Sequence, residues 1–530
     1  MRKLLVVILL LIFLALNIFS ALRESLTYDE PVHLKAGIEE WQTKIFSLDA
    51  NNPPLIREIT ALPMLFGAQK LISSPYPAHQ YLPSRLMITF LGLILAVVVF
   101  KYIEKHFGWK PALFSLILFV FEPNVLAYSH YVTLDLGTVL FFFLAYLSFL
   151  RFLDKPDFKN GLTWSLFFGL AMASKVTIIP ALCLSFLVMV VIKRKSLNQF
   201  FWKKAFLGII FSLLVVWTTY FFTFSPVIAE RKDPNRLSEK ILVFAEKKSY
   251  QFLKNFIYFG KGKPVPLGYF LTTIKNGLVY NLQPHRTEFL GQFYPDNRFY
   301  FLPTIIALKT PLPLLILFFV GIFLACKKRE KIILSMIMPI FFLVFFFSFG
   351  HIYPRLRYAL AIYPFIIIVA SFGAGVLLKK RLGQMILGLI LLWYVVGTLS
   401  VLPHFISFAN EIAGLKDKRL FLFSDSNYDW GQSLFDLKEY VGEENIAILY
   451  LSYFGQDNPN EYGFVADRPY GVKLEERCPF YSVVLKDEGK KVLAISLSNY
   501  YYCDYFQQDK FAKKKVSQVV GDSILIFNSQ

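Results

Sequence analysis

The chain has 530 residues, of which 55% are hydrophobic and 18% aromatic, and this composition is typical of a membrane protein. Its formal net charge of +19 would suit nucleic-acid binding, but the basic residues gather in alternate loops between apolar segments. Such placement follows the positive-inside rule and argues against nucleic acid as a partner.

Apolar segments long enough to span a bilayer recur along the chain. A longer apolar stretch, 162–192, is interrupted at Ser174-Lys175, and we interpret it as two spans that meet in a tight turn. The sequence therefore predicts a mainly α, polytopic membrane protein with about 11 transmembrane helices, at 4–22, 86–103, 111–128, 135–153, 162–174, 176–192, 205–225, 302–325, 332–350, 359–378 and 383–402.

The alternation of basic loops predicts a cytoplasmic N-terminus, and an odd number of spans then puts the C-terminus outside the cell. We interpret residues 1–22 as an uncleaved anchor because their apolar run is long for a signal peptide. The expected division is a transmembrane domain over 1–402, with external loops 23–85 and 226–301, and an extracytoplasmic domain over 403–530.

The first external loop carries helix signals. Thr27 and Glu30 fit a capping box, and Pro31 falls within the first turn, where proline is tolerated. The sequence predicts two interfacial helices joined by the proline turn 51–54, each with one apolar stripe, formed by Leu34, Ile38, Trp41 and Ile45 and by Leu55, Ile59, Leu62 and Phe66.

The C-terminal domain reads as a small α/β unit. A helix is expected over 430–441, and short strands are expected at Phe421–Phe423, Ile446–Tyr450, Tyr481–Leu485, Lys491–Ser496 and Ser523–Phe527. Cys478 and Cys503 both fall on the outside, where oxidation is favoured, so they form either one disulfide or two unpaired thiols.

Three carboxylates near the outer membrane surface are candidate catalytic groups, because charge at that depth is costly without a function. On a helix Asp29 and His33 lie one turn apart on the same side, whereas Glu30 points about 100° away. Capping alone accounts for Glu30, and the helix N-terminus is an alternative account of Asp29 and of Asp135, which opens the fourth span.

Cations on the outer side run against the positive-inside pattern, and arginine suits phosphate. Together with the carboxylates they predict an outward-facing site for an anionic lipid, in an enzyme or in a transporter. The alternative role for each of these cations is that of an interfacial anchor. The candidate phosphate-binding residues are Arg57, Arg85, Lys175, Arg355 and Arg357, with His351 nearby.

Several segments in order resemble one family. They are "TYDEPVHLKAG", "NNPPLIRE", "RLMITFLG", "TLDLGTVLFFFLAYLSFLRFL", "GLAMASKVTIIP", "FYFLPTIIALKTPLPLL", "RYALAIYPF" and "DSNYDWGQSLFDLKEYV". The chain resembles the GT-C-type glycosyltransferases that use polyprenyl-phosphate sugars, in the branch of bacterial protein O-mannosyltransferases and the lipid A aminoarabinose transferase.

The resemblance implies inverting transfer of a sugar, mannose-like or other, from a polyprenyl-phosphate carrier to an acceptor hydroxyl of a protein, lipid or glycan. It implies a multi-pass protein of the bacterial plasma or inner membrane, acting on its external face. The family's first-loop acid is the general base, a role that falls on Asp29, and Glu30 and Asp135 are further catalytic candidates. His33 is expected to position the acceptor or another substrate.

We expect no required cofactor or metal, although Asp29 and Asp135 leave a shared divalent ion open. The alternative function is a transporter or flippase for a lipid-linked anion. It is less favoured because only one broken span, at Ser174-Lys175, is visible and it has no counterpart in a second half of the sequence.

Overall fold

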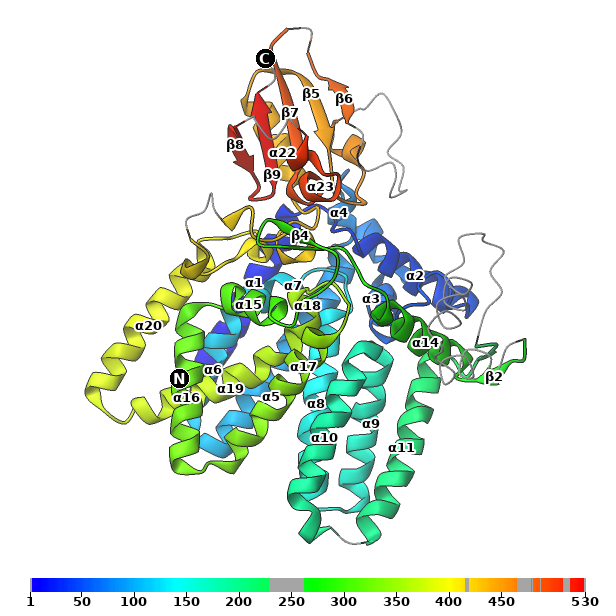
Figure 1. The fold of residues 1–530 in the computed structure, drawn as a ribbon, viewed down its shortest axis with the longest axis vertical. Coiled ribbons are helices and arrows are strands. Elements are labelled where there is room, and N and C mark those ends of the chain that lie inside the picture. The colour runs from blue at the N-terminus through cyan, green and yellow to red at the C-terminus, as the bar shows by residue number, and fades with distance from the viewer. Residues whose placement is uncertain are drawn as a thin grey trace.

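The computed structural model describes residues 2–197, 199–227, 262–414, 419–464, 478, 480–486, 488–508 and 515–528. Helices form the body of the molecule, and a five-stranded sheet lies at one end of its long axis (Figure 1). The part 228–261 of the predicted second external loop lies outside the described residues.

The described helices, apart from short 3-10 turns, are α1 (Arg2–Arg23), α2 (Glu30–Thr43), α3 (Leu55–Leu65), α4 (Pro77–Gln80), α5 (Leu82–Phe107), α6 (Trp109–Val120), α7 (Pro123–Tyr128), α8 (Asp135–Asp154), α9 (Phe158–Ser174), α10 (Ile179–Lys193), α11 (Gln199–Thr219), α14 (Gly268–Leu282), α15 (Phe301–Lys309), α16 (Leu312–Lys328), α17 (Lys331–Phe349), α18 (Leu356–Ala359), α19 (Tyr363–Leu377), α20 (Arg381–Leu399), α22 (Leu434–Glu443) and α23 (Leu497–Tyr502). The described strands are β1 (Phe224–Ser225), β2 (Val265–Pro266), β3 (Thr287–Phe289), β4 (Gln292–Tyr294), β5 (Ile446–Ser452), β6 (Tyr481–Val484), β7 (Lys490–Ser496), β8 (Gln518–Val520) and β9 (Ile524–Asn528).

The chain is a multi-pass membrane protein. Among the described residues, 8 helices are long and apolar enough to cross a membrane, or up to 9 if the bent pair α15 and α16 counts as one span. Each of the eleven predicted segments contains helix, but the count of 11 spans is not confirmed, because α6, α9 and α16 have only 12, 17 and 17 residues.

Prolines explain the two predicted spans that are not straight. Helices α15 and α16 meet at 111°, and the break falls at Thr310-Pro311, where the residue before proline is disfavoured in helix. The predicted span 111–128 divides into α6 and α7 because Pro123 begins a new helix, which the Glu122 carboxylate caps by accepting from Val125 N over 2.5 Å.

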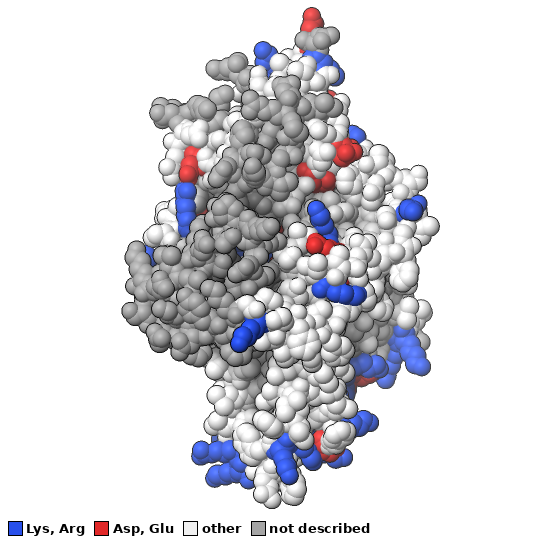
Figure 2. Space-filling model, turned by 90° about the vertical axis from the view of Figure 1, so that its right-hand side faces the viewer, with Lys and Arg blue, Asp and Glu red and all other residues white. Residues whose placement is uncertain are grey.

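Lys and Arg side chains gather at the end of the molecule farthest from the sheet, below a broad uncharged belt (Figure 2). This distribution is the one expected if that end faces the cytoplasm and the sheet lies outside. The orientation of the termini stays a prediction.

The two helices predicted in the first loop are α2 and α3, and the proline turn joins them. Leu34 on α2 is buried with Ala61 and Val132, and Ile38 and Trp41 pack against them as the predicted stripe requires. Ile45 lies beyond the end of α2 and is 46% exposed. The two helices cross closely at Gly37, where a Cβ atom would lie 2.4 Å from the carbonyl oxygen of Arg57.

The C-terminal sheet has the strand order β6-β5-β7-β9-β8. Strands β5 and β7 are parallel, and the other neighbours are antiparallel. Four of the five predicted strands are present, but Phe421–Phe423 lies in a turn, the helix predicted at 430–441 begins only at Leu434, and β8 was not predicted. The predicted boundary between 402 and 403 falls shortly after α20.

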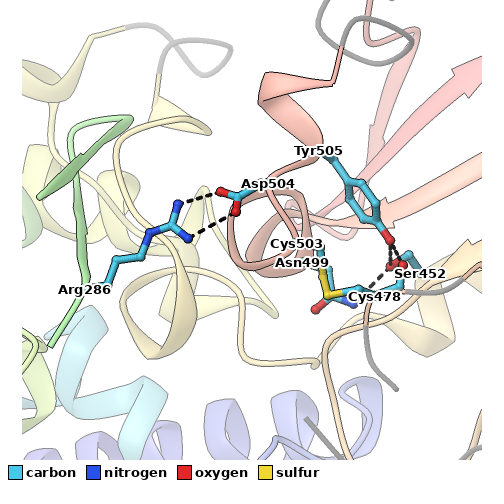
Figure 3. Close-up of a disulfide and its surroundings, with 7 residues drawn as sticks. All are labelled: Arg286, Ser452, Cys478, Asn499, Cys503, Asp504 and Tyr505. Carbon is cyan, nitrogen blue, oxygen red and sulfur yellow. Dashed lines mark hydrogen bonds and ion pairs between the residues drawn. A yellow bond between two sulfur atoms is a disulfide. The ribbon is translucent and has the colours of Figure 1, made fainter. Parts of the chain in front are cut away.

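Cys478 and Cys503 form a disulfide, which decides between the two alternatives left by the sequence (Figure 3). Beside it, Arg286 of the segment before β3 forms an ion pair with Asp504 over 2.6 Å. The end of α23 is therefore tied to two other segments of the chain.

Candidate functional site

A cavity of about 550 Å³ opens between the first loop, the segments around α14 and α18, and the C-terminal region. It lies where the N-terminus of α2, the turn before α18 and the helix α23 converge. The residues that line it are Tyr28, Asp29, Tyr280, His285, Arg286, Tyr353, Arg355, Asp425, Trp430, Phe454, Cys478, Asn499, Tyr502 and Cys503.

Asp29 occupies the N-cap position of α2, but its side chain caps no backbone N–H group. Instead, Oδ2 accepts a hydrogen bond from Arg357 Nη1 over 2.6 Å. Burial favours the protonated form of Asp29, but Arg357, His33 and Arg355 outweigh it and hold the pKa of this carboxyl below its usual range. Asp29 is therefore an ionised carboxylate, one quarter of whose side chain is exposed.

Arg355 and Arg357 lie on either side of Leu356 where α18 begins. Arg355 Nη2 donates to Asp425 Oδ2 over 2.8 Å, and that oxygen also accepts from the Tyr502 hydroxyl over 2.9 Å. The Nε–H groups of both arginines are buried and have no hydrogen-bond partner among the described residues. Because a buried donor without a partner is costly, these two N–H groups suit an anionic ligand.

Lys175 and Asp135 form a second ion pair next to the first, with Lys175 Nζ 2.6 Å from Asp135 Oδ1. The chain is extended at Lys175, which separates α9 from the next helical turn at the predicted break. Lys175 Nζ lies 4.8 Å, and Arg357 Cζ 5.5 Å, from the centroid of the Tyr358 ring. The Tyr358 ring thus lies between Lys175, which pairs with Asp135, and Arg357, which pairs with Asp29.

Glu30 and Arg85 lie elsewhere, in a fully buried pair. Arg85 Nε and Nη2 donate to the two Glu30 oxygens over 2.9 and 2.8 Å. The other N–H groups of Arg85 donate to the carbonyl oxygens of residues 21, 24 and 25. Glu30 also accepts from Thr27 N over 2.8 Å, which is one of the two bonds of a capping box, but the Thr27 hydroxyl donates to the same carboxylate and the N-cap of α2 is Asp29, not Thr27.

Arg57 is likewise enclosed by acids of the first loop. Its guanidinium forms ion pairs with Glu40 and with Asp49, the latter over 2.7 Å between Nη1 and Oδ2, and it also donates to the Asn52 carbonyl oxygen. His33 Nδ1 lies 3.2 Å from the same Asp49 oxygen. Arg57, Arg85, Glu30 and His33 are therefore not among the residues that line the cavity.

The turn 425–430 holds the two sides of the site together. The Asn427 side chain donates to the Pro354 carbonyl oxygen over 3.0 Å and accepts from Leu356 N over 2.8 Å, which fixes the backbone that carries Arg355. On the other side, Tyr28 N donates to the Trp430 carbonyl oxygen over 3.0 Å, directly before Asp29.

Sequence reasoning named Cys478 and Cys503 as a possible disulfide, but it named no catalytic or binding candidate among the cavity residues of the C-terminal region. Asp425 and Trp430 belong to "DSNYDWGQ", a segment singled out only for its resemblance to a family. Asn499 and Tyr502 stand in "SLSNYYYC", which carries no recognised motif, although its neighbour Cys503 was noted. The only signal in the sequence was that these two segments are rich in polar and aromatic residues.

Within the described part of the chain, no three His, Cys, Asp or Glu side chains are placed together as metal ligands would be. The acids of the cavity are paired with cations instead, Asp29 with Arg357 and Asp425 with Arg355. Whether a divalent ion takes part stays a prediction.

Three comparisons relate the chain to known proteins. Residues 78–221 match the profile of a family described as dolichyl-phosphate-mannose-protein mannosyltransferase. No curated protein sequence matches the chain.

Solved structures that align with the chain include ArnT from Cupriavidus metallidurans in the apo state, with 14% identity and a TM-score of 0.48. They also include the same protein bound to undecaprenyl phosphate, with 13% identity and a TM-score of 0.48. Each of these two alignments covers 99% of this chain and 98% of the ArnT chain. The Archaeoglobus fulgidus oligosaccharyltransferase in complex with Zn and sulfate has 13% identity and a TM-score of 0.44, over 83% of this chain and 55% of that one.

The stretch that matches the family profile runs from α4 through α11 and contains Asp135 and Lys175, which lie beside Arg357 in the structure. The match therefore makes residues 78–221, and not the whole chain, similar to this family.

Proposed function

We propose that the protein transfers a sugar, mannose-like or other, from a polyprenyl-phosphate carrier to an acceptor hydroxyl on the external face of the membrane, with inversion at the sugar carbon. One observation carries the proposal: an ionised carboxylate, Asp29, and Arg355 line one cavity, and Arg357 is bonded to Asp29 at its edge. Both arginines have a buried Nε–H group without a partner among the described residues. The profile that matches 78–221 is named for a dolichyl-phosphate-mannose donor, which is a lipid of this class.

Asp29 is proposed as the general base. It takes the proton of the acceptor hydroxyl as that oxygen bonds to C1 of the sugar, and the bond from C1 to the phosphate oxygen breaks. The electron pair leaves with the polyprenyl phosphate, which gains negative charge. Attack from the side opposite the phosphate inverts the configuration at C1.

Arg355 and Arg357 are proposed to bind the departing phosphate, because their Nε–H groups can donate to it without giving up Asp425 or Asp29. Lys175 adds positive charge beside the Tyr358 ring, and Asp135 holds that ammonium in place. Asp135 is therefore proposed as a positioning residue, and Asp29 as the base.

Arg57 and Arg85 are assigned a different role from the phosphate contact that the sequence suggested. Their guanidinium groups already donate to buried carboxylates and carbonyl oxygens of the first loop and its flanks. We infer that they fix the loop that presents Asp29. Glu30 bonds to Thr27 N at the start of α2 and anchors Arg85, and His33 lies 3.2 Å from Asp49 on the first loop.

The acceptor is a hydroxyl of a protein, lipid or glycan outside the cell, and the proposed location is a bacterial plasma or inner membrane with the N-terminus in the cytoplasm. The gathering of Lys and Arg at the end away from the sheet supports this orientation (Figure 2). A transporter of lipid-linked anions is less favoured, since the family match is to a transferase.

The test uses the full-length protein in liposomes that contain undecaprenyl-phosphoryl-mannose labelled in the sugar, with cell-envelope extract as the acceptor. We expect label to appear in envelope material together with free undecaprenyl phosphate, and we expect neither with the Asp29→Asn variant. Movement of the labelled lipid across the bilayer without any glycoside would instead support a flippase and contradict the proposal.

A further inference from the structure

The cavity wall supplied by the C-terminal region is built from polar groups of two elements. Asp425 comes from the turn before α22, and Asn499 and Tyr502 come from α23. The disulfide at Cys503 and the ion pair between Arg286 and Asp504 hold the end of α23 in place (Figure 3). This wall is therefore tied down on the side that faces the arginines.

The position of the phosphate limits where the sugar can be. In the proposed function, on which this inference rests, the phosphate lies at the Nε–H groups of Arg355 and Arg357. The sugar is joined to that phosphate through one oxygen atom, so it must lie in the adjoining cavity. Asp425 and Tyr502 line that cavity beside Arg355, because Asp425 accepts from Arg355 over 2.8 Å and from Tyr502 over 2.9 Å.

Asp425 has the chemistry to accept a sugar hydroxyl. Its carboxylate accepts from Arg355 Nη2, from the Tyr502 hydroxyl and from Ser426 N. Two carboxylate oxygens offer about four acceptor positions. Those three bonds occupy three of them, which leaves one for a ligand hydroxyl.

The backbone of Asp425 is in the left-handed region, with φ +54°. This conformation is disfavoured for an L-residue, less for Asp than for most, and such residues concentrate at ligand sites. It is held by three bonds: Asp425 N donates to Ser498 Oγ, and its carbonyl oxygen accepts from the N–H groups of Tyr428 and Asp429. The fold thus maintains a strained position at the wall of the cavity.

Aromatic rings complete the wall. Phe454 stacks on Tyr28 with the centroids 5.2 Å apart and on Tyr502 with the centroids 5.6 Å apart. A cavity of about 550 Å³ lined by rings and a few hydrogen-bonding groups has the size and character of a small-molecule site. The C–H faces of a sugar can pack against such rings while its hydroxyls bond to the polar groups.

We propose that Asp425 and Tyr502 recognise ring hydroxyls of the donor sugar, so that the C-terminal region determines which sugar is transferred. Asp29 and the arginines then act where the bond between sugar and phosphate breaks, whereas Asp425 and Tyr502 bind hydroxyls elsewhere on the sugar ring. Loss of one hydroxyl bond to a charged acceptor is expected to weaken binding about 10- to 100-fold.

The test measures binding of full-length protein in detergent to bare undecaprenyl phosphate and to undecaprenyl-phosphoryl lipids that carry mannose, glucose, galactose or arabinose. We expect the unchanged protein to bind at least one sugar lipid 10-fold or more tighter than undecaprenyl phosphate. Asp425→Asn and Tyr502→Phe should abolish this preference and leave binding of undecaprenyl phosphate within about threefold. Tyr500→Phe is the matched control, since Tyr500 is on the same helix but does not line the cavity.

Three results would overturn the inference while leaving the proposed function standing. The unchanged protein could bind every sugar lipid no tighter than undecaprenyl phosphate, the preference could survive in both variants, or both variants could lose undecaprenyl phosphate to the same degree as the sugar lipid. The last would show that Asp425 acts only through Arg355. Failure of the unchanged protein to bind any of these lipids would contradict the proposed function itself. Tyr502→Phe keeps the test decisive if Asp425→Asn does not fold, because it removes only one hydroxyl.

Discussion

Arg357 donates from Nη1 to Oδ2 of Asp29 over 2.6 Å, across 328 residues of sequence. The same guanidinium keeps its Nε–H group buried and without a partner among the described residues. One cation therefore holds the proposed base ionised and is placed to stabilise the leaving phosphate. Arg357 therefore couples proton removal by Asp29 to departure of the phosphate. The substitutions below test these two steps separately.

Asp29→Asn removes the base without changing the size of the side chain. We expect the rate of sugar transfer to fall about 10²- to 10⁴-fold, because general-base catalysis contributes that much. The measurement is single-turnover release of undecaprenyl phosphate from the donor. Glu39→Gln, on the same helix α2 but outside the cavity, is the control and should retain activity. Near-normal turnover by Asp29→Asn would remove Asp29 from the role of base.

Arg357→Gln should change the pH dependence of transfer as well as its rate. Without this cation, burial dominates the environment of Asp29 and raises its pKa, so the carboxylate becomes protonated at a higher pH. The acidic limb of kcat/KM is therefore expected to move to higher pH than in the unchanged protein. Lys175→Gln provides the comparison: it should lower the rate and leave the limb in place, because Lys175 pairs with Asp135 and not with Asp29. Identical pH profiles for Arg357→Gln and the unchanged protein would contradict the coupling.

Glu30→Gln tests the buried pair behind the site. Arg85 would keep its charge while fully buried, and breaking one side of a buried pair typically costs about 3–5 kcal/mol. We expect a clearly lower melting temperature in detergent. The control is Glu439→Gln, which breaks the exposed pair with Arg23, worth about 0–1 kcal/mol. Equal melting temperatures for the two variants would show that the buried pair adds nothing to stability.

Much of the membrane part could be predicted from the sequence because hydropathy and capping are local properties. Runs of apolar residues marked the helices, and Thr27 with Glu30 marked the start of α2. Pairing is not local. Nothing near Arg85 in the sequence shows that its partner is Glu30, 55 residues earlier, so Arg85 looked as available to a phosphate as Arg357. Counting the cations on the outer side could not distinguish arginines that pair with buried acids from arginines that keep an N–H group without a partner among the described residues.

The role of the C-terminal region in the cavity could not be predicted from the sequence, again because pairing between distant segments is not local. Asp425 faces the cavity that Asp29 lines only because the turn 425–430 bonds to Tyr28 on one side and to Leu356 on the other. Neither bond leaves a pattern in the sequence. The strands β5, β7 and β9 were predictable because each contains a short run of apolar residues with two β-branched side chains.

Reduction of the disulfide should loosen the cavity wall. Its two cysteines are 25 residues apart, and closing a loop of this size stabilises a fold by about 3 kcal/mol. We expect Cys503→Ser, or treatment with dithiothreitol, to lower the melting temperature and to raise KM for the donor. Cys326→Ser is the matched control, because Cys326 is a free, exposed thiol at the end of α16. If dithiothreitol lowers the activity of Cys503→Ser as much as that of the unchanged protein, its effect does not pass through this bond.

His404 should make the stability of the protein depend on pH. It lies between two acids, with Nδ1 3.0 Å from Glu24 Oε1 and Nε2 3.1 Å from Asp436 Oδ2, so it links the ends of α1 and α20 to α22. Burial favours the neutral ring, but Asp436 and Glu24 outweigh it and raise the pKa of His404 to about 10. In the unfolded chain the pKa of histidine is about 6.5. The stabilisation is therefore complete below about pH 6.5 and is lost as the pH rises toward 10.

We accordingly expect the melting temperature of the full-length protein to fall between pH 7 and pH 10, and His404→Gln to flatten that slope. The neighbouring Glu24 does not contribute to it, because His130 and His404 overcome the effect of burial and lower its pKa to about 2, so it stays ionised throughout this range. His351→Gln is the control, since its pair with Asp296 is largely exposed to solvent and should leave the slope unchanged. A slope that persists in His404→Gln would mean that groups other than His404 release the protons.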